Sequence, residues 1–139
     1  MTGINRSYLG LSILYALFLA TLVTLANLGA GPDLFAAVGS IRFGDKISHL
    51  ILMGIFSYLV NTALNGRRTT RLGPPIQVGS LVVFVIVAAE EFSQGFFPRR
   101  TVNAVDLLAD LIGIGLFGWL ARRNLKRQGR LPADSAPRP

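Results

Sequence analysis

Ionisable and amide side chains are concentrated between two long apolar runs of this chain. The stretch 90–113 includes Glu90, Glu91, Gln94, Arg99, Arg100, Asp106 and Asp110. Charged groups inside a bilayer are costly, and they persist there when they are paired, face a water-filled cavity or serve a function. We therefore interpret the stretch 90–113 as the centre of a candidate functional site and the rest of the chain as its support.

A second group of chemically active residues, Asp45, Lys46 and His49, lies earlier in the chain. Three pairs of polar residues are spaced by four positions: Asp45 with His49, Glu90 with Gln94, and Asp106 with Asp110. Residues four apart share one face of a helix. The spacing therefore predicts three helices that each present a polar face.

The composition is typical of a membrane protein. Of the 139 residues, 51% are hydrophobic and 15% are charged, whereas a soluble domain carries about 25% charged residues. We expect one domain at this length. The sequence contains no cysteine, which excludes disulfides, thiolate nucleophiles and thiolate metal ligands.

Apolar segments predict an all-α fold, a polytopic membrane protein with four transmembrane helices in a bundle. The expected spans are residues 8–28, 47–64, 76–91 and 104–120. The first would be about 31 Å long as a helix, enough to cross the hydrocarbon layer. A signal peptide is the alternative, but its apolar region is usually about 7–15 residues long. The β-branched third segment is assigned to a helix because an open strand cannot satisfy its backbone in lipid.

Smaller signals refine these helices. Asn103 is a predicted N-cap for the fourth helix. Gly113, Gly115 and Gly118 are interpreted as positions at which helices pack closely. We expect residues 1–121 to form the membrane domain and residues 122–139 to form a basic, disordered cytoplasmic tail.

The distribution of Lys and Arg predicts the orientation. Ten lie on the side of the termini: Arg6, Arg67, Arg68, Arg71, Arg122, Arg123, Lys126, Arg127, Arg130 and Arg138. Four lie on the other side: Arg42, Lys46, Arg99 and Arg100. Because cytoplasmic loops are enriched in basic residues, we expect both termini in the cytoplasm. The net charge of +7 is thereby explained by topology, and we expect no nucleic-acid partner.

This orientation places the polar segments at one depth. At about 1.5 Å per residue, Glu91 and Asp110 lie roughly 9 Å, and His49 roughly 6 Å, below the outer ends of their helices. We therefore predict a shared cavity that opens to the outside.

The polar residues also carry a family resemblance. They are Asp45-Lys46 with His49, Glu91 with Gln94, Pro98 with Arg100, Asp106, and Gly113. In this order they resemble the VanZ-like family of small bacterial integral membrane proteins, over about residues 40 to 120. The resemblance implies a multi-pass protein of the bacterial inner (cytoplasmic) membrane that acts at the cell envelope, with a link to glycopeptide antibiotic resistance. One position departs from the family pattern, because Asp110 stands where the family usually has Asn.

Two interpretations of the polar residues remain open. In the first, a buried ion-pair network locks the helices of a non-catalytic membrane subunit or scaffold. In the second, Lys46 and Arg100 bind an anionic headgroup or phosphate on the extracytoplasmic side. The second interpretation adds Asp45, Gln94 and Asp110 to the ligand-binding residues, and it makes Glu91, His49 and Asp106 the candidates for acid–base catalysis. Whether the chain is an enzyme stays open.

A metal site would use Asp45, His49, Glu91 and Asp106. The neighbouring Lys46 and Arg100 would repel a cation, so we predict neither a metal nor another cofactor. The expected partners are membrane lipids and an anionic, lipid-linked or phosphorylated envelope molecule. Homo-oligomer formation remains open.

Overall fold

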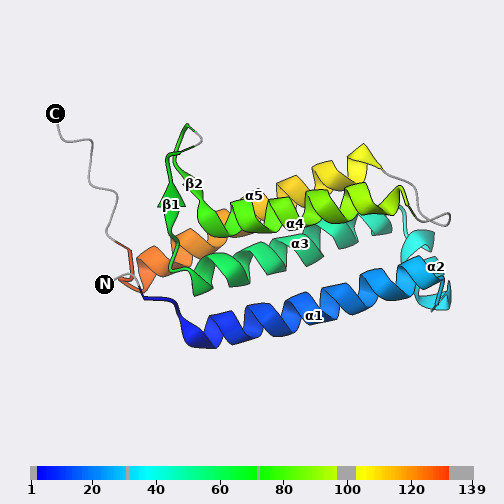
Figure 1. Cartoon of the computed structure of the whole chain (residues 1–139), viewed down its shortest axis with the longest axis horizontal. Helices are drawn as coiled ribbons and strands as arrows, with labels where there is room; N and C mark the ends of the chain where they lie inside the picture. The colour runs from blue at the N-terminus through cyan, green and yellow to red at the C-terminus, as the bar shows by residue number, and fades with distance from the viewer. Residues whose placement is uncertain (1–2, 31, 72, 97–102, 132–139) are drawn as a thin grey trace.

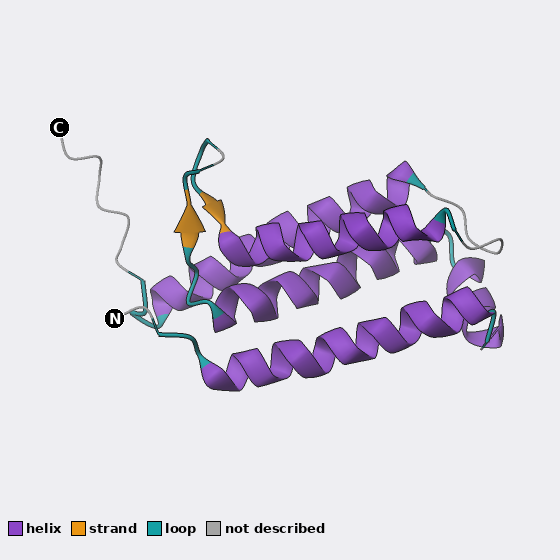
Figure 2. Cartoon of the chain, viewed as in Figure 1, coloured by secondary structure: helices purple, strands orange, loops and turns teal. Residues whose placement is uncertain are grey.

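The computed structural model describes residues 3–30, 32–71, 73–96 and 103–131. The described chain is mostly helical, as the sequence predicts (Figures 1 and 2). The helices are α1 (Arg6–Leu28), α2 (Pro32–Ser40), α3 (Gly44–Ala63), α4 (Val78–Gln94) and α5 (Ala104–Arg127). Two short strands, β1 (Arg68–Thr69) and β2 (Ile76–Gln77), pair antiparallel between α3 and α4.

The four long helices lie side by side, and the short helix α2 lies at one end of them (Figure 1). Helix α3 is central, because α1, α4 and α5 all pack against it. Helices α3 and α5 run in the same direction, and α1 and α4 run in the opposite one (Figure 1). The start of α1 meets the end of α3, where the backbone N–H of Asn5 donates to the carbonyl of Ala63 at 2.8 Å.

Local sequence explains where the helices begin and end. The Asn5 side chain caps α1 by accepting from the Tyr8 N–H, and Gly29 ends that helix at φ 67°. The predicted cap Asn103 is confirmed, since its side chain accepts from the Val105 N–H at 3.0 Å. Helix α5 continues to Arg127, beyond residue 120, so the first part of the expected tail is helical.

The core lies where the four long helices meet. It is formed by one or two buried residues from each helix: Leu19, Phe56, Val83, Val87 and Ile114. Large apolar side chains also cover the outer faces, as at Leu14 and Leu17, which are 66% and 61% exposed. Soluble monomers rarely expose such contiguous apolar surface. These faces are suited to contact with lipid.

Two of the helices, α1 and α5, are long and apolar enough to cross a membrane, judged by length and composition. This finding gives the chain the character of a membrane-associated protein. The finer expectation of four spans with both termini in the cytoplasm stays a prediction.

Glycines bring the helices close together. A Cβ atom at Gly113 of α5 would collide with the backbone carbonyl of Leu50 in α3, and one at Gly118 would meet Ser80 Oγ at 2.6 Å. Both positions confirm the predicted packing role. The same prediction is wrong for Gly115, where a Cβ would meet nothing within 4 Å. Gly115 lies two residues after Gly113, and about 100° of rotation per residue directs it to the opposite face.

Candidate functional site

The first two turns of α3 and α5 form a charged interface, which we call the α3–α5 charge cluster (Asp45, Lys46, His49, Asp106 and Asp110). Lys46 Nζ donates to Asp45 Oδ2 at 2.9 Å and to Asp106 Oδ1. His49 Nδ1 lies 3.1 Å and 3.3 Å from the two carboxylate oxygens of Asp110. The two helices are parallel, so these pairs follow one another on successive turns.

The close approach at Gly113 sets this register. Leu50 follows His49 in α3, and Gly113 lies one turn after Asp110 in α5. Because the backbones almost touch at Leu50 and Gly113, the nearby side chains of His49 and Asp110 can reach across the interface directly. The glycine therefore positions the His49–Asp110 pair without contacting it.

The charge cluster passes from exposed to buried along the helices. The Asp45 side chain is 59% exposed, that of Lys46 is 28% exposed and that of Asp110 is 2% exposed. The outer pair, Lys46 with Asp45, can therefore exchange partners with solvent or a ligand. In the inner pair, Asp110 is enclosed by protein and the His49 side chain is 21% exposed. Lys46 lies at the boundary between the two.

A second cluster joins the end of α4 to the start of α5, and we call it the acid–amide cluster (Glu90, Glu91, Gln94 and Asn103). Gln94 Nε2 donates to Glu90 at 2.9 Å and to Glu91 Oε2 at 3.0 Å. The other oxygen of Glu91 accepts from the backbone N–H of Asn103 at 2.5 Å. Glu91 is only 4% exposed, and both of its oxygens have protein partners.

The structure brings the predicted site residues to one end of the bundle in two groups. Asp45, Lys46, His49, Asp106 and Asp110 form the α3–α5 charge cluster, and Glu91 and Gln94 belong to the acid–amide cluster. The predicted binding residue Arg100, like its neighbour Arg99, lies outside the described residues.

The pairing differs in detail from the sequence pattern. The pattern paired Asp45 with His49 on one face of α3, but His49 contacts Asp110 from the neighbouring helix. Neither the pocket on α1 nor the pocket between α1 and α4 is lined by Lys46 or Asp106, and Glu90 is the one acid that lines either. Among the described residues, no group of three or more His, Asp or Glu side chains is arranged to hold a metal ion.

Sequence reasoning missed a neutral polar cluster farther along the same interface, which we call the serine–asparagine cluster (Ser57, Asn61 and Ser80). Ser57 Oγ donates to the carbonyl of Ile114 at 3.0 Å, and Asn61 Nδ2 donates to Ser80 Oγ at 2.9 Å. Ser57 and Asn61 are both 0% exposed. The i, i+4 spacing of Ser57 and Asn61 inside an apolar span was the available signal, because such residues bond across membrane helices.

Comparison with known proteins adds no relative to this geometry. No known family model matches the chain, and no curated protein and no solved structure is similar to it. The functional argument therefore rests on the residues of this chain.

Proposed function

We propose that the chain is a VanZ-like protein of the bacterial inner membrane that crosses the bilayer four times, with both termini in the cytoplasm. The apolar lengths of α1 and α5 support this proposal. Helices α3 and α4, of 20 and 17 residues, would be about 30 and 25 Å long, close to the hydrocarbon thickness of about 30 Å.

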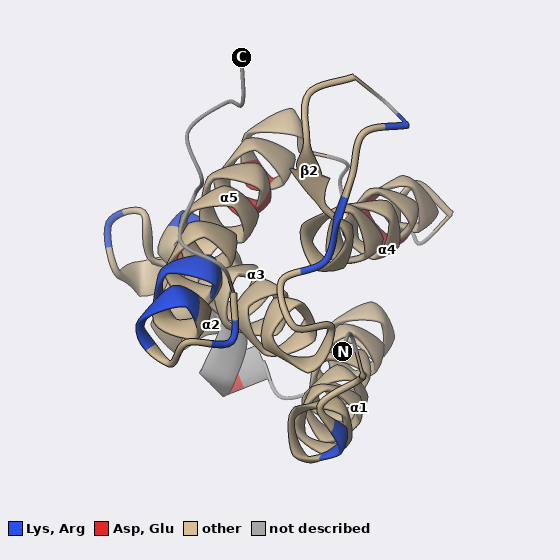
Figure 3. Ribbon diagram, turned by 90° about the vertical axis from the view of Figure 1, so that its left-hand side faces the viewer, with Lys and Arg blue, Asp and Glu red and all other residues tan. Residues whose placement is uncertain are grey.

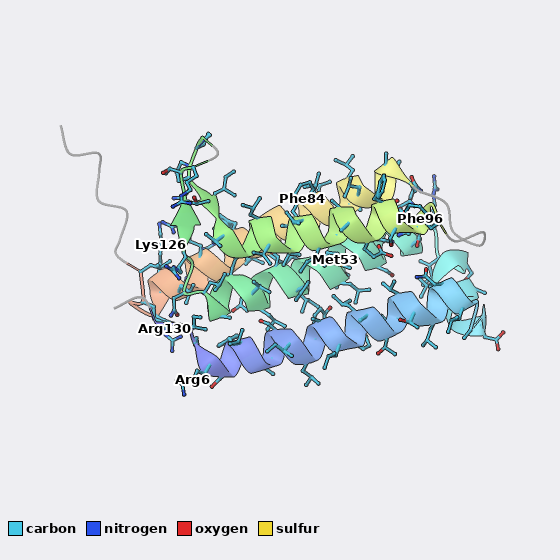
Figure 4. The ribbon with its side chains drawn as sticks, viewed as in Figure 1. Arg6, Met53, Phe84, Phe96, Lys126 and Arg130 are labelled. Atoms are coloured by element: carbon cyan, nitrogen blue, oxygen red, sulfur yellow. The ribbon has the colours of Figure 1, made fainter. Side chains whose placement is uncertain are left out.

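The charge distribution supports the orientation. Arg6, Lys126 and Arg130 lie at one end of the bundle and Phe96 lies at the other (Figure 4). Seen from the basic end, Lys and Arg lie at the near ends of the helices and on the α3–α4 connection, and the acidic segments of α4 and α5 lie farther back (Figure 3). The basic end is the cytoplasmic one under the positive-inside rule. The two clusters then face the extracytoplasmic side.

We infer that this outer end binds the anionic headgroup or phosphate of a cell-envelope molecule, either lipid-linked or phosphorylated. The observation that carries this inference is the partly exposed Lys46, whose ammonium is held by Asp106 of α5 and by the exposed Asp45. An exposed ion pair contributes about 0–1 kcal/mol, so a phosphate oxygen can replace Asp45. Asp106 would keep the ammonium in place during that exchange.

Other predicted residues complete the proposed site. Arg100 belongs in sequence to the α4–α5 connection, and its planar guanidinium is suited to bidentate phosphate binding. If the ligand is processed, His49 is the acid–base candidate, because Asp110 engages Nδ1 and thereby orients the ring. Glu91 is less suited to proton transfer, since both of its oxygens have protein partners.

The test is lipid retention by the purified full-length protein, measured by native mass spectrometry with phosphatidic acid as the probe. Diacylglycerol with the same acyl chains is the control lipid, since it lacks only the phosphate. We expect Lys46→Gln to weaken retention of phosphatidic acid at least tenfold, and the matched variant Arg130→Gln at the opposite end to leave it unchanged. Equal retention by wild type and Lys46→Gln would disprove the phosphate site.

A cellular measurement complements the binding test. Alanine variants at Lys46, His49, Glu91, Arg100 and Asp106 that insert normally are expected to alter glycopeptide sensitivity. No change in any envelope phenotype would argue against the site.

The second candidate is a non-catalytic membrane subunit whose ion-pair network is structural. The His49–Asp110 pair, in which Asp110 is buried, and the fully engaged Glu91 favour it, because they are satisfied without a ligand. Purification in mild detergent separates the candidates. An obligate subunit aggregates or co-purifies with a partner protein, whereas a self-contained binding protein is stable and retains lipid.

A further inference from the structure

A groove with a volume of about 330 Å³ opens between α1 and α4, above the central helix α3. Helix α1 packs mainly against α3, and the end-on view shows α1 and α4 as separate neighbours of α3 (Figure 3). The groove is lined by Ala16, Leu19, Ala20, Val23 and Thr24 of α1, by Met53 and Phe56 of α3, and by Ile86, Val87 and Glu90 of α4.

The groove is apolar along its length and polar at one end. Its two most polar residues, Thr24 and Glu90, are the last lining residues of α1 and α4, which both run toward the end that carries the charge clusters. Thr24 donates its hydroxyl to the carbonyl of Ala20 at 2.7 Å, so its methyl group remains for apolar contact. Glu90 supplies the charged group. This polarity matches an amphiphile with its chain directed toward the middle of the bundle.

The length of the groove matches one leaflet. From Ala16 to Thr24 the groove follows α1 for eight residues, which is about 12 Å. Half of the hydrocarbon layer is about 15 Å thick. A single chain from the outer leaflet therefore fits along the groove with its headgroup near Glu90.

Glu90 also connects the groove to the acid–amide cluster. Gln94 Nε2 donates to both Glu90 oxygens, at 3.1 Å and 2.9 Å, and also to Glu91. These bonds hold the Glu90 carboxylate at the mouth of the groove. A fixed carboxylate selects for a headgroup that donates hydrogen bonds, since charge-assisted bonds are about twice as strong as neutral ones.

We propose that the groove between α1 and α4 binds one chain of an outer-leaflet aminophospholipid, whose ammonium group donates to Glu90. This proposal rests on the proposed function for its membrane orientation, and it names the ligand class, because the same headgroup also carries a phosphate. Phosphatidylethanolamine has the required N–H donors. Phosphatidylcholine has the same charges and phosphate, but its methylated nitrogen cannot donate.

The experiment is competition between these two lipids for the full-length protein, measured by native mass spectrometry with identical acyl chains. We expect wild type to retain phosphatidylethanolamine at least fivefold better than phosphatidylcholine. Ala20→Phe fills the groove from an exposed position and is expected to lower retention of both lipids about tenfold. Gly10→Leu is the matched control, because a side chain there extends from α1 into open space.

The variant Glu90→Gln separates the contribution of the lipid headgroup to binding from that of the acyl chain. This variant is expected to retain lipid while losing the preference for the ethanolamine headgroup. Equal retention by wild type, Ala20→Phe and Gly10→Leu would overturn the chain site, and an absent headgroup preference in wild type would overturn the role of Glu90. A dimer that retains no lipid and that Ala20→Phe dissociates would show that a second copy occupies the groove.

The two proposals fail in distinguishable ways. If Lys46→Gln leaves phosphatidic acid retention unchanged while Ala20→Phe lowers phospholipid retention, the phosphate site is disproved and the chain groove is supported. If Lys46→Gln weakens phosphatidic acid retention while Ala20→Phe has no effect, the chain groove is disproved and the phosphate site is supported.

Discussion

The α3–α5 charge cluster and the serine–asparagine cluster use different polar chemistry in one helix bundle. In the charge cluster, ionisable pairs join α3 to α5 while exposure falls from 59% at Asp45 to 2% at Asp110. In the other cluster, hydroxyl and amide groups form hydrogen bonds of 3.0 Å and 2.9 Å, and Ser57 and Asn61 are completely buried. The neutral cluster is suited to holding helices together. The charged one has a partly exposed end that can serve a ligand.

The largest effect is expected at Gly113, the glycine that sets the register of the charge cluster. Gly113→Leu forces α5 away from the Leu50 carbonyl. Overpacking usually costs about 1–3 kcal/mol, and we expect more than about 4 kcal/mol because the obstacle is backbone. Thermal unfolding in detergent measures this loss. Gly113→Ala gives a smaller version of the same effect should the leucine variant fail to insert.

Gly115→Ala is the matched control for that prediction. Its side chain enters open space, and alanine in a helix is more favourable than glycine by about 1 kcal/mol. A control variant that is destabilised as much as Gly113→Ala would contradict the importance of the close approach.

The next largest effect is expected at the inner charged pair. Asp110→Ala leaves His49 without its buried partner, and breaking such a pair costs about 3–5 kcal/mol. Asp110→Asn keeps an acceptor for the ring, so its loss of unfolding free energy is expected to be less than half as large. Chemical or thermal unfolding compares the two variants. Equal losses would show that the charge, rather than the hydrogen bond, stabilises the pair.

A smaller effect is expected in the serine–asparagine cluster. Ser57→Ala removes the bond to the Ile114 carbonyl and the contact with Ser80. Side-chain hydrogen bonds between membrane helices contribute about 0.6 kcal/mol on average, and we expect a loss near that value. A loss as large as that of Asp110→Ala would remove the contrast between the two clusters.

The smallest effect is expected at the exposed end of the charge cluster. Asp45→Asn removes a surface ion pair, so its effect on unfolding is expected to stay within about 0.5 kcal/mol. The same variant is expected to increase phosphatidic acid retention, because Lys46 loses a competing carboxylate. Reduced retention would instead make Asp45 part of the binding surface.

Sequence patterns predicted which helix face a polar residue occupies better than they predicted which residue it contacts. The spacing of polar residues placed Asp45 and His49 on one helix face and Asp106 and Asp110 on another. The structure pairs His49 with Asp110, and Lys46 with Asp106, across α3 and α5. The cross-helix partners depend on the relative register of two helices, which a backbone contact at Gly113 sets. No spacing within one helix contains that information.

The cluster of neutral polar residues was also not predicted from the sequence. Ser57, Asn61 and Ser80 carry no charge, so they do not interrupt an apolar run in the way that Asp or Lys does. The cap at Asn103 was predictable because its function is local, between residues two positions apart. The β1–β2 hairpin was not predicted, since its two-residue strands are too short to show alternation.

Helix direction determines the local electrostatic environment of the acids at the end of the bundle that carries the charge cluster. Asp45 and Asp106 lie in the first turns of α3 and α5, where the peptide dipoles present partial positive charge to a carboxylate. Glu90 and Glu91 lie near the end of α4, where the dipole is of the opposite sign and exposed carbonyls repel an anion. The α4 acids must therefore obtain their donors elsewhere, and the Gln94 amide and the Asn103 N–H provide them.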